Sequence, residues 1–202
     1  MEPLTLSSSI IQNFIPARKS TSRKGDNGIV LVVGGSYIYH GAPVLSSLAA
    51  LRCGTDLVYT CVPKINVTPT RAISPNLIVI PLVDQKLTLG AVKKLVGALP
   101  RNLHSATIGM GLAIQEKNSL LHLVKSLLDR DVRLSLDASA LIPEVLPILA
   151  HKNVVVTPHA GEFKRLFGDV PSDSNLERIK LVEENALKHG ITILLKGSTD
   201  II

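Results

Sequence analysis

A histidine and a carboxylate stand in one short segment, residues 157–162, directly after three consecutive valines. An imidazole can donate to or accept from a ligand, and a carboxylate can orient a hydroxyl group or a bound cation. A purely structural explanation competes with this one. Pro158 and Gly161 favour a turn, and Glu162 suits the first turn of a following helix. The segment alone does not decide between the two, so the elements that carry it have to be considered.

Four other polar or glycine-rich turns also follow apolar runs, at residues 34–43, 109–112, 137–141 and 195–200. The first could offer backbone amides to a phosphate, or it could be only a tight turn, since it is neither GxGxxG nor a Walker A loop. Asp137 could cap a helix or face a ligand. Loops at one edge of a sheet converge in space, so five such turns together indicate a binding site.

Short apolar runs alternate with helical periodicity along the chain, which predicts an α/β fold with a mainly parallel sheet and helices on both faces. The predicted strands are residues 29–33, 57–61, 77–80, 105–109, 132–136, 154–156 and 191–195. The predicted helices are residues 42–52, 88–99, 116–129, 139–150 and 175–188, the last preceded by a capping-box pattern at Ser174 and Glu177. Residues 1–25 are expected to form an irregular lead-in. Open sheets of this kind bind ligands beyond the carboxyl ends of their strands.

Composition limits the possible partners. The 202 residues suit one domain, and 46% of them are hydrophobic but only 3% aromatic, which argues against a stacking surface for bases. The net charge of +6 permits an anionic ligand without indicating nucleic acid. No apolar run is long enough to span a membrane, and the start does not resemble a signal peptide. Cys53 and Cys61 form no metal or redox motif, so a cytoplasmic protein with reduced thiols is expected.

Several motifs occur in an order that is specific although each motif alone is weak. They are Lys24-Gly25-x-x-Gly28, Gly34-Gly35-Ser36, Tyr39-x-Gly41-Ala42-Pro43, Ala50-Leu51-Arg52-x-Gly54, Gly109-x-Gly111-Leu112, Asp137-Ala138-x-Ala140-Leu141, Thr157-Pro158-His159-x-Gly161-Glu162 and Leu195-Lys196-Gly197. From about residue 16 to its end, the chain resembles the ADP/ATP-dependent NAD(P)H-hydrate dehydratases of the ribokinase-like superfamily. The resemblance implies a single ribokinase-like domain over residues 1–202, with three α/β/α layers.

The resemblance implies a metabolite-repair enzyme, a hydro-lyase that acts on hydrated NADH or NADPH (NADHX or NADPHX). ADP or ATP, with Mg²⁺, would phosphorylate the hydrate hydroxyl, and loss of phosphate would restore the reduced cofactor. By position, the residues that correspond to hydrate-binding positions are Ala42, Gly111 and His159. Those that correspond to the nucleotide-binding loop are Lys196, Gly197, Ser198, Thr199 and Asp200. Supporting positions are Gly35, Ser36, Gly41, Gly109, Asp137 and Glu162, and the two carboxylates are expected to organise the site or a magnesium ion through water. No direct metal ligand is predicted.

The family's catalytic aspartate lies in a Gly-Thr-Gly-Asp motif downstream of the Lys-Gly strand, and these 202 residues do not contain that motif. The aspartate is the expected general base, and the adjacent glycines supply amides to the transferring phosphoryl group. Asp200 lacks the glycine frame. We therefore expect the base beyond Ile202, no catalytic residue within the chain, and a C-terminally shortened fragment with little activity.

Two other classes stay open. One is a kinase of the same superfamily that acts on a vitamin precursor or a sugar, and the other is a catalytically incomplete nucleotide-binding module. The resemblance further implies a homo-oligomer, which could be a tetramer, and a separate epimerase as pathway partner. Neither nucleic acid nor a membrane is expected as a partner.

Overall fold

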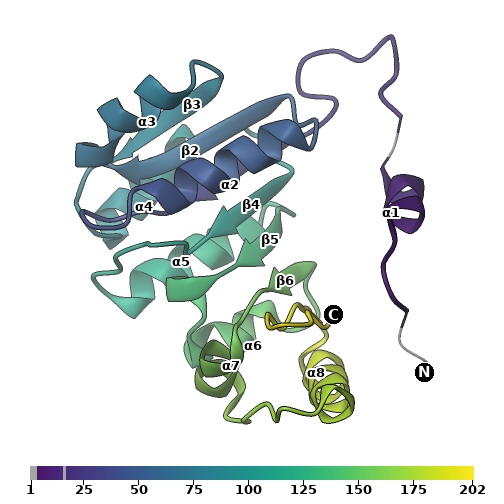
Figure 1. Ribbon diagram of the computed structural model, residues 1–202. Coiled ribbons are helices and arrows are strands. Elements are labelled where there is room, and N and C mark those ends of the chain that lie inside the picture. Colours follow the sequence, from purple (N-terminus) through teal and green to yellow (C-terminus); the bar gives the residue numbers. More distant parts are fainter. Residues whose placement is uncertain (1–3, 16) are drawn as a thin grey trace.

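The computed structural model describes residues 4–15 and 17–202, and a seven-stranded sheet forms its centre (Figure 1). The strands are β1 (Ile29–Val33), β2 (Leu57–Pro63), β3 (Leu77–Leu82), β4 (Ser105–Ile108), β5 (Arg133–Leu136), β6 (Val154–Val156) and β7 (Thr192–Ile193). Their order is β3-β2-β1-β4-β5-β6-β7, and each neighbouring pair is parallel. The predicted mainly parallel α/β sheet is confirmed.

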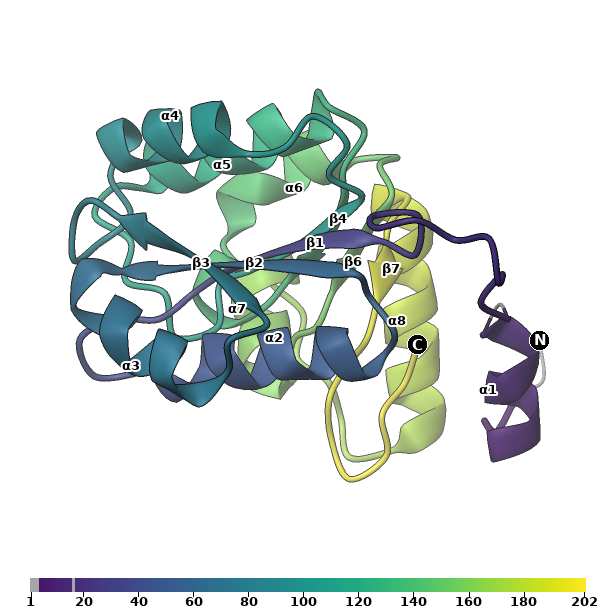
Figure 2. The ribbon, with the colours of Figure 1, turned by 90° about the horizontal axis from the view of Figure 1, so that it is seen from above.

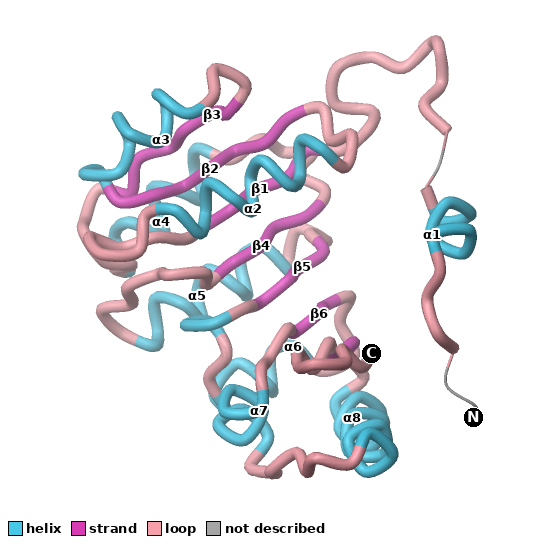
Figure 3. Tube along the Cα trace, viewed as in Figure 1, coloured by secondary structure: helices cyan, strands magenta, loops and turns pink. Residues whose placement is uncertain are grey.

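Helices cover both faces of the sheet and complete three α/β/α layers (Figure 2). One face carries α4 (Leu89–Ala98), α5 (Lys117–Leu128) and the single turn α6 (Leu146–Leu149). The other carries α2 (Gly41–Arg52), α3 (Val67–Ile73), α7 (Ala160–Phe167) and α8 (Asn175–His189). A long loop separates the remaining helix, α1 (Ser8–Phe14), from the body (Figure 3). None of these helices, within the described residues, is both long and apolar enough to cross a bilayer.

The core forms where apolar helix stripes meet the buried strands. On α5, Leu120, Leu123, Val124 and Leu127 recur at spacings of three and four and are all 0% exposed. They join one large apolar cluster that also contains Leu31 and Val33 of β1. Each such side chain contributes roughly 1.5–3 kcal/mol when it is buried. This core holds the sheet rigid beneath the loops at its edges.

Some predicted elements differ from the structure. In place of a helix over 139–150, the chain forms two 3₁₀ turns, η2 (Ala138–Ala140) and η3 (Pro143–Val145), and the short α6, because Pro143 and Pro147 interrupt the helical hydrogen bonds. The list of predicted helices also omitted α3 and α7, although the turn explanation of Glu162 implied a helix there, and α1 was treated as irregular. The capping box predicted at Ser174 is wrong, since within the described residues that side chain makes no capping bond.

The order in which strands are added to the sheet reverses between β1 and β4. From β1 the next two strands add on one side, and from β4 the remaining strands add on the other. At such a switch point the loops leave in opposite directions and open a crevice. Since all seven strands are parallel, the five turns noted in the sequence lie at one edge, here called the carboxyl edge.

Candidate active site

Backbone contacts join the loops after β1 and β4. The amide of Gly35 donates to the carbonyl of Met110 at 2.9 Å, and the amide of Gly109 donates to Val33 at 3.0 Å. Gly109 has a φ of +121°, and a Cβ there would lie 1.9 Å from the carbonyl oxygen of Asp137. Only glycine fits such an approach, because any side chain overlaps the neighbouring backbone. A Cβ on Gly111, at φ +64°, would likewise lie 2.7 Å from the Cβ of Tyr39.

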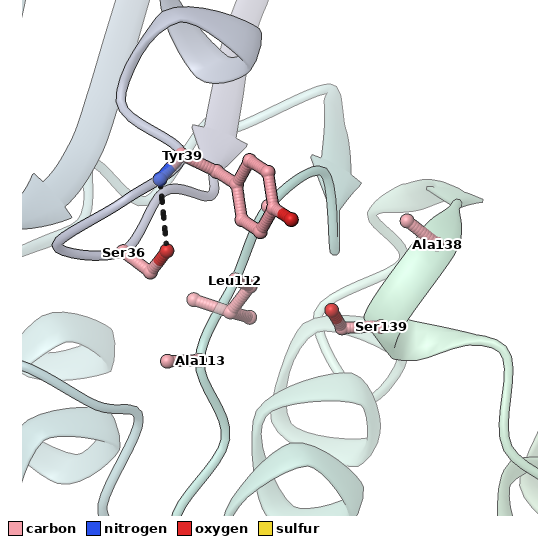
Figure 4. Close-up of a pocket in the computed structure, with 7 residues that line it drawn as sticks. Ser36, Tyr39, Leu112, Ala113, Ala138 and Ser139 are labelled. Carbon is pink, nitrogen blue, oxygen red and sulfur yellow. Dashed lines mark hydrogen bonds between the residues drawn. The ribbon is translucent and has the colours of Figure 1, made fainter.

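These loops border a hollow of about 420 Å³ at the switch point. Its walls are Ser36, Tyr39, Gly111, Leu112, Ala113, Ala138 and Ser139 (Figure 4). The hydroxyl of Ser36 accepts a 3.1 Å hydrogen bond from the amide of Tyr39, which fixes the loop after β1. Ala138 has a φ of +50°, a conformation that alanine seldom adopts. The size and the mostly apolar walls with a few hydroxyls are those of a small-molecule site.

Asp137 is the centre of a charged network beside this hollow. Its Oδ1 accepts hydrogen bonds from Lys196 Nζ at 2.7 Å and from the hydroxyl of Thr157 at 2.9 Å. Lys196 Nζ also lies 3.8 Å from Oε2 of Glu162. Asp137 precedes η2, but its side chain makes no capping bond to the turn within the described residues. The helix-cap explanation for Asp137 is therefore wrong, and its carboxylate joins three strand ends instead.

His159 and Glu162 form the capping box that begins α7. Nδ1 of His159 accepts from the amides of Gly161 at 3.0 Å and Glu162 at 3.4 Å, and the amide of His159 donates to Glu162 Oε2 at 2.9 Å. Because Nδ1 accepts from these amides, Nε2 is the ring nitrogen that remains to donate. Nε2 lies 3.6 Å from Oε1 of Glu162, which is beyond hydrogen-bond distance, and the side chain of His159 is 60% exposed, so a ligand can reach this nitrogen. Capping and ligand binding use different atoms of the ring, and the two explanations are compatible.

The predicted nucleotide loop lies next to His159. The amide of Lys196 donates to the carbonyl of Pro158 at 2.8 Å, where the two chain segments form a parallel bridge. Leu195 and Ile201 close the base of the loop with two backbone hydrogen bonds of 2.8 and 3.0 Å. The amide of Gly197 donates to Asp200 Oδ1 at 2.9 Å within the loop. Residues 197–200 are exposed, so a ligand can reach them.

The structure brings most of the predicted residues together. Gly35, Gly109 and Gly111 shape the hollow, and Ser36 is part of its wall. The charged network contains Asp137, His159, Glu162 and Lys196.

Ala42 and Gly41 stand apart from these two groups. Ala42 packs against the small apolar cluster of Val32, Val58, Leu77 and Met110 and is not among the residues lining the hollow. A Cβ on Gly41 would have no described atom within 4 Å. Tyr39, Ala138 and Ser139 line the hollow but were not predicted as site residues. Tyr39 and Ala138 occur in the motifs quoted above, whereas only its place in a strand-end turn pointed to Ser139.

A magnesium role fits the carboxylates only in part. The described residues contain no group of three or more His, Cys, Asp or Glu side chains that could hold a metal ion. Mg²⁺ in phosphoryl-transfer sites is often held by one or two carboxylates together with substrate phosphates and waters. Asp137 and Glu162, which converge on the same ammonium group, match that donor set. They would hold the ion only together with a bound nucleotide.

The two cysteines lie outside this chemistry. Cys61 is buried in β2, and burial raises the pKa of its thiol, which keeps it protonated and unreactive. Cys53 is exposed, and both are free thiols. Neither cysteine lines the hollow, and among the described residues they form no disulfide.

A three-layer α/β/α fold with a hollow at its switch point and an acid–lysine network beside it defines an α/β protein with a ligand site at the carboxyl edge of its sheet. The comparisons with known proteins narrow this class. The NAD(P)H-hydrate dehydratase family model (Carb_kinase) matches residues 30–202. The chain is 82% identical over 198 residues to the ADP-dependent (S)-NAD(P)H-hydrate dehydratase of Nitrosopumilus maritimus, a match that covers 98% of the chain and 69% of that protein. The chain belongs to the NAD(P)H-hydrate dehydratase family.

Solved structures agree on the fold. The ADP/ATP-dependent NAD(P)H-hydrate dehydratase of Bacillus subtilis, co-crystallised with ATP and Mg²⁺, superimposes with a TM-score of 0.75 at 27% identity, over 92% of this chain and 63% of that one. A ribokinase-like superfamily protein from Enterococcus faecalis gives a TM-score of 0.78 at 23% identity, over 99% of this chain and 70% of that one. The predicted ribokinase-like fold is confirmed.

Proposed function

We propose that this chain carries the binding site of an enzyme that dehydrates NADHX or NADPHX at the expense of ADP or ATP. The observation that carries the proposal is the adjacency of the hollow at the switch point and the Asp137–Lys196 pair, with the loop of residues 196–200 beside it. The named activity of the Nitrosopumilus relative supports it and makes ADP the first co-substrate to test.

In the proposed reaction, the hydroxyl oxygen of the hydrate takes a phosphoryl group from the nucleotide and releases its proton. The carbon–oxygen bond then breaks, phosphate leaves with the bonding electrons, and the neighbouring carbon loses a proton as the ring double bond forms. Such chemistry needs positioning and electrostatic stabilisation more than a covalent partner. It sets three tasks for the site: to hold the dinucleotide, to hold the nucleotide and to neutralise the transferring group.

We assign these tasks to residues that lie in sequence along the carboxyl edge. The hollow, with Gly111 in its wall, would hold the hydrated ring, and His159 would donate its Nε2–H to the dinucleotide. Residues 196–200 would hold the adenine nucleotide. Lys196, at the start of this loop and paired with Asp137 beside the hollow, would place its charge on the phosphoryl group, oriented by Asp137 and Glu162. Mg²⁺, when bound, would neutralise phosphate charge beside the same two carboxylates.

Further expectations are part of the proposal. Ala42 remains a predicted contact of the hydrate through the start of α2. The general base is expected in a Gly-Thr-Gly-Asp segment outside these 202 residues, so we expect little turnover by the chain as given. A cytoplasmic homo-oligomer, with a separate epimerase as pathway partner, completes the proposal.

The test is turnover of hydrated NADH, followed by the return of the reduced-nicotinamide absorbance with ADP, with ATP and with neither. The 202-residue chain and a gene product that continues past Ile202 are measured side by side, with the Nitrosopumilus relative as positive control. We expect nucleotide-dependent recovery in the longer protein. A stable phosphorylated product would instead indicate a small-molecule kinase, and nucleotide binding without any product would indicate a binding module.

A further inference from the structure

A buried arginine contacts the loop of residues 196–200 from behind. Arg178, in the first turn of α8, is 8% exposed, and its guanidinium donates to the carbonyl of Thr199 at 3.2 Å and to Oδ1 of Asn175 at 3.2 Å. Among the described residues, no carboxylate oxygen lies within 4.0 Å of its nitrogens. The positive charge is therefore buried against two neutral acceptors.

Burying a charge beside neutral acceptors alone lowers the stability of the fold. A buried cation is usually matched by an anion, because neutral acceptors offset only part of its lost hydration. An arginine that only stabilised α8 could remain in solvent, since its long stem allows the charge to reach water. The burial of Arg178 is therefore best explained by its contacts. One of its two acceptors is a backbone carbonyl of the nucleotide loop.

Gly197 is shaped to receive the guanidinium. A Cβ at this position would lie 2.5 Å from NH2 and 3.2 Å from Cζ of Arg178. The φ of Gly197 lies outside the left-handed region, so a side chain here would act by its volume: it would have to push the flexible end of Arg178 aside. The guanidinium of Arg178 thus packs against the space that the missing side chain of Gly197 leaves open.

The loop has few other restraints. Its base is closed by Leu195 and Ile201, and within it Gly197 donates to Asp200. In the described part of the chain, the bond from Arg178 to Thr199 is the only hydrogen bond that reaches residues 197–200 from outside the loop. Residues 197–200 are otherwise exposed, and their backbone would be free to move without this contact.

We propose that Arg178 is a positioning residue for the nucleotide: it fixes the tip of the 196–200 loop and brings an uncompensated positive charge beside it. This inference rests on the proposed function, in which that loop holds the adenine nucleotide. A loop held in its binding conformation loses less entropy when the ligand binds. A nearby cation also favours a polyanionic nucleotide over a neutral ligand.

The test compares Arg178→Met, Arg178→Lys, Gly197→Ala and the double variant Arg178→Met/Gly197→Ala in the longer gene product. Arg178→Met should raise the KM for ADP by about tenfold or more, because it removes the charge-assisted hydrogen bond that holds the loop. The KM for hydrated NADH should stay within about twofold, as should kcat at saturating ADP. Arg178→Lys should recover part of the loss because it keeps the charge.

Gly197→Ala should reproduce the Arg178→Met effect, and the double variant should be no worse than the single ones, since the two residues act as one unit. The control is Arg130→Met, which also removes an arginine bonded only to carbonyls, those of Val96 and Pro100, but at the amino end of β5. It should leave both KM values unchanged. Melting temperatures identify any variant that fails to fold. If Arg178→Met fails to fold, Gly197→Ala still tests the proposal, because this residue lies on an exposed loop.

The outcomes separate the two proposals. Wild-type protein that shows no nucleotide-dependent recovery overturns the proposed function. Active wild-type protein whose folded Arg178→Met and Gly197→Ala variants keep the wild-type KM for ADP overturns the role of Arg178 alone. A parallel rise in the KM values for ADP and hydrate overturns it as well, since a general structural defect would act on both.

Discussion

The loops after β1 and β4 and the loops after β5, β6 and β7 form two halves of the carboxyl edge that differ in the kind of contact they use. After β1 and β4, the chain uses glycines and backbone hydrogen bonds, and the walls of the hollow carry no ionised side chain. After β5, β6 and β7, it uses Asp137, His159, Glu162 and Lys196, which are joined by side-chain contacts. The first half is specified by shape and the second by charge. Substitutions should therefore damage the first half through folding and the second through chemistry.

The largest expected effect is that of Gly109→Ala. The new methyl group would overlap the carbonyl of Asp137, and the residue would keep an unfavourable φ, so we expect a loss of at least about 3 kcal/mol in the free energy of unfolding. Gly90→Ala in α4 is the matched control, because a Cβ there meets no described atom within 4 Å. It should stabilise the helix by up to about 1 kcal/mol. Chemical denaturation measures both, and equal stabilities would contradict the shape-based half.

Lys196→Met should act in the opposite way, with the fold kept and turnover lost. Removing the ammonium group leaves two carboxylates facing the transferring phosphoryl group, and a fall in kcat of about 10²-fold to 10³-fold is expected. Lys117→Met is the control, since Lys117 pairs with Glu144 away from the site and should have no effect on kcat. Steady-state kinetics on the longer gene product decides, and an unchanged kcat in Lys196→Met would remove Lys196 from the chemistry.

His159 has two separable roles, because its Nδ1 caps α7 while its Nε2 is exposed and lies 3.6 Å from Oε1 of Glu162, beyond hydrogen-bond distance. His159→Ala should lose the cap, at about 1 kcal/mol, whereas His159→Ser should keep most of it. Both should raise the KM for the hydrate by about tenfold, because both lack the Nε2 donor. Thermal unfolding and kinetics separate these effects. If serine restores hydrate binding as well as stability, the ring is only a cap.

The smallest expected effect is that of Thr157→Val. This change removes the hydroxyl that orients Asp137 and keeps the shape of the side chain. A loss of about 0.5–1.5 kcal/mol in stability and a fall in kcat below tenfold are expected, since Lys196 still holds the carboxylate. Thr157→Ser, which retains the hydroxyl, should restore kcat. Wild-type kcat in Thr157→Val would show that Asp137 needs no such support.

Much of this could be read from the sequence, and the reasons for the failures are physical. Apolar runs such as residues 154–156 predicted the strands, because a strand buried on both faces has to be apolar throughout. The helix predicted over 139–150 failed because periodicity outweighed two prolines. The capping box was assigned to Ser174 and Glu177 from a serine rule, while the pair that forms one begins with His159, an uncommon cap.

The site could be predicted only where residue type alone carries the chemistry. The charged residues of the network were identified beforehand, because strand-end carboxylates and lysines are conspicuous. Ala138 and Ser139 were not, because small side chains line a hollow only by virtue of backbone geometry. Arg178 was missed for a similar reason: in the sequence it is one of 22 basic residues, and only its burial distinguishes it.

Amide hydrogen exchange on the longer gene product tests the division of the edge most directly, with ADP alone and with hydrated NADH alone. The account predicts that ADP slows exchange in residues 196–200 and leaves residues 34–40 unchanged. Hydrated NADH should slow exchange in residues 34–40 and 109–113. Protection of residues 34–40 by ADP, with residues 196–200 unaffected, would contradict the assignment of the two halves.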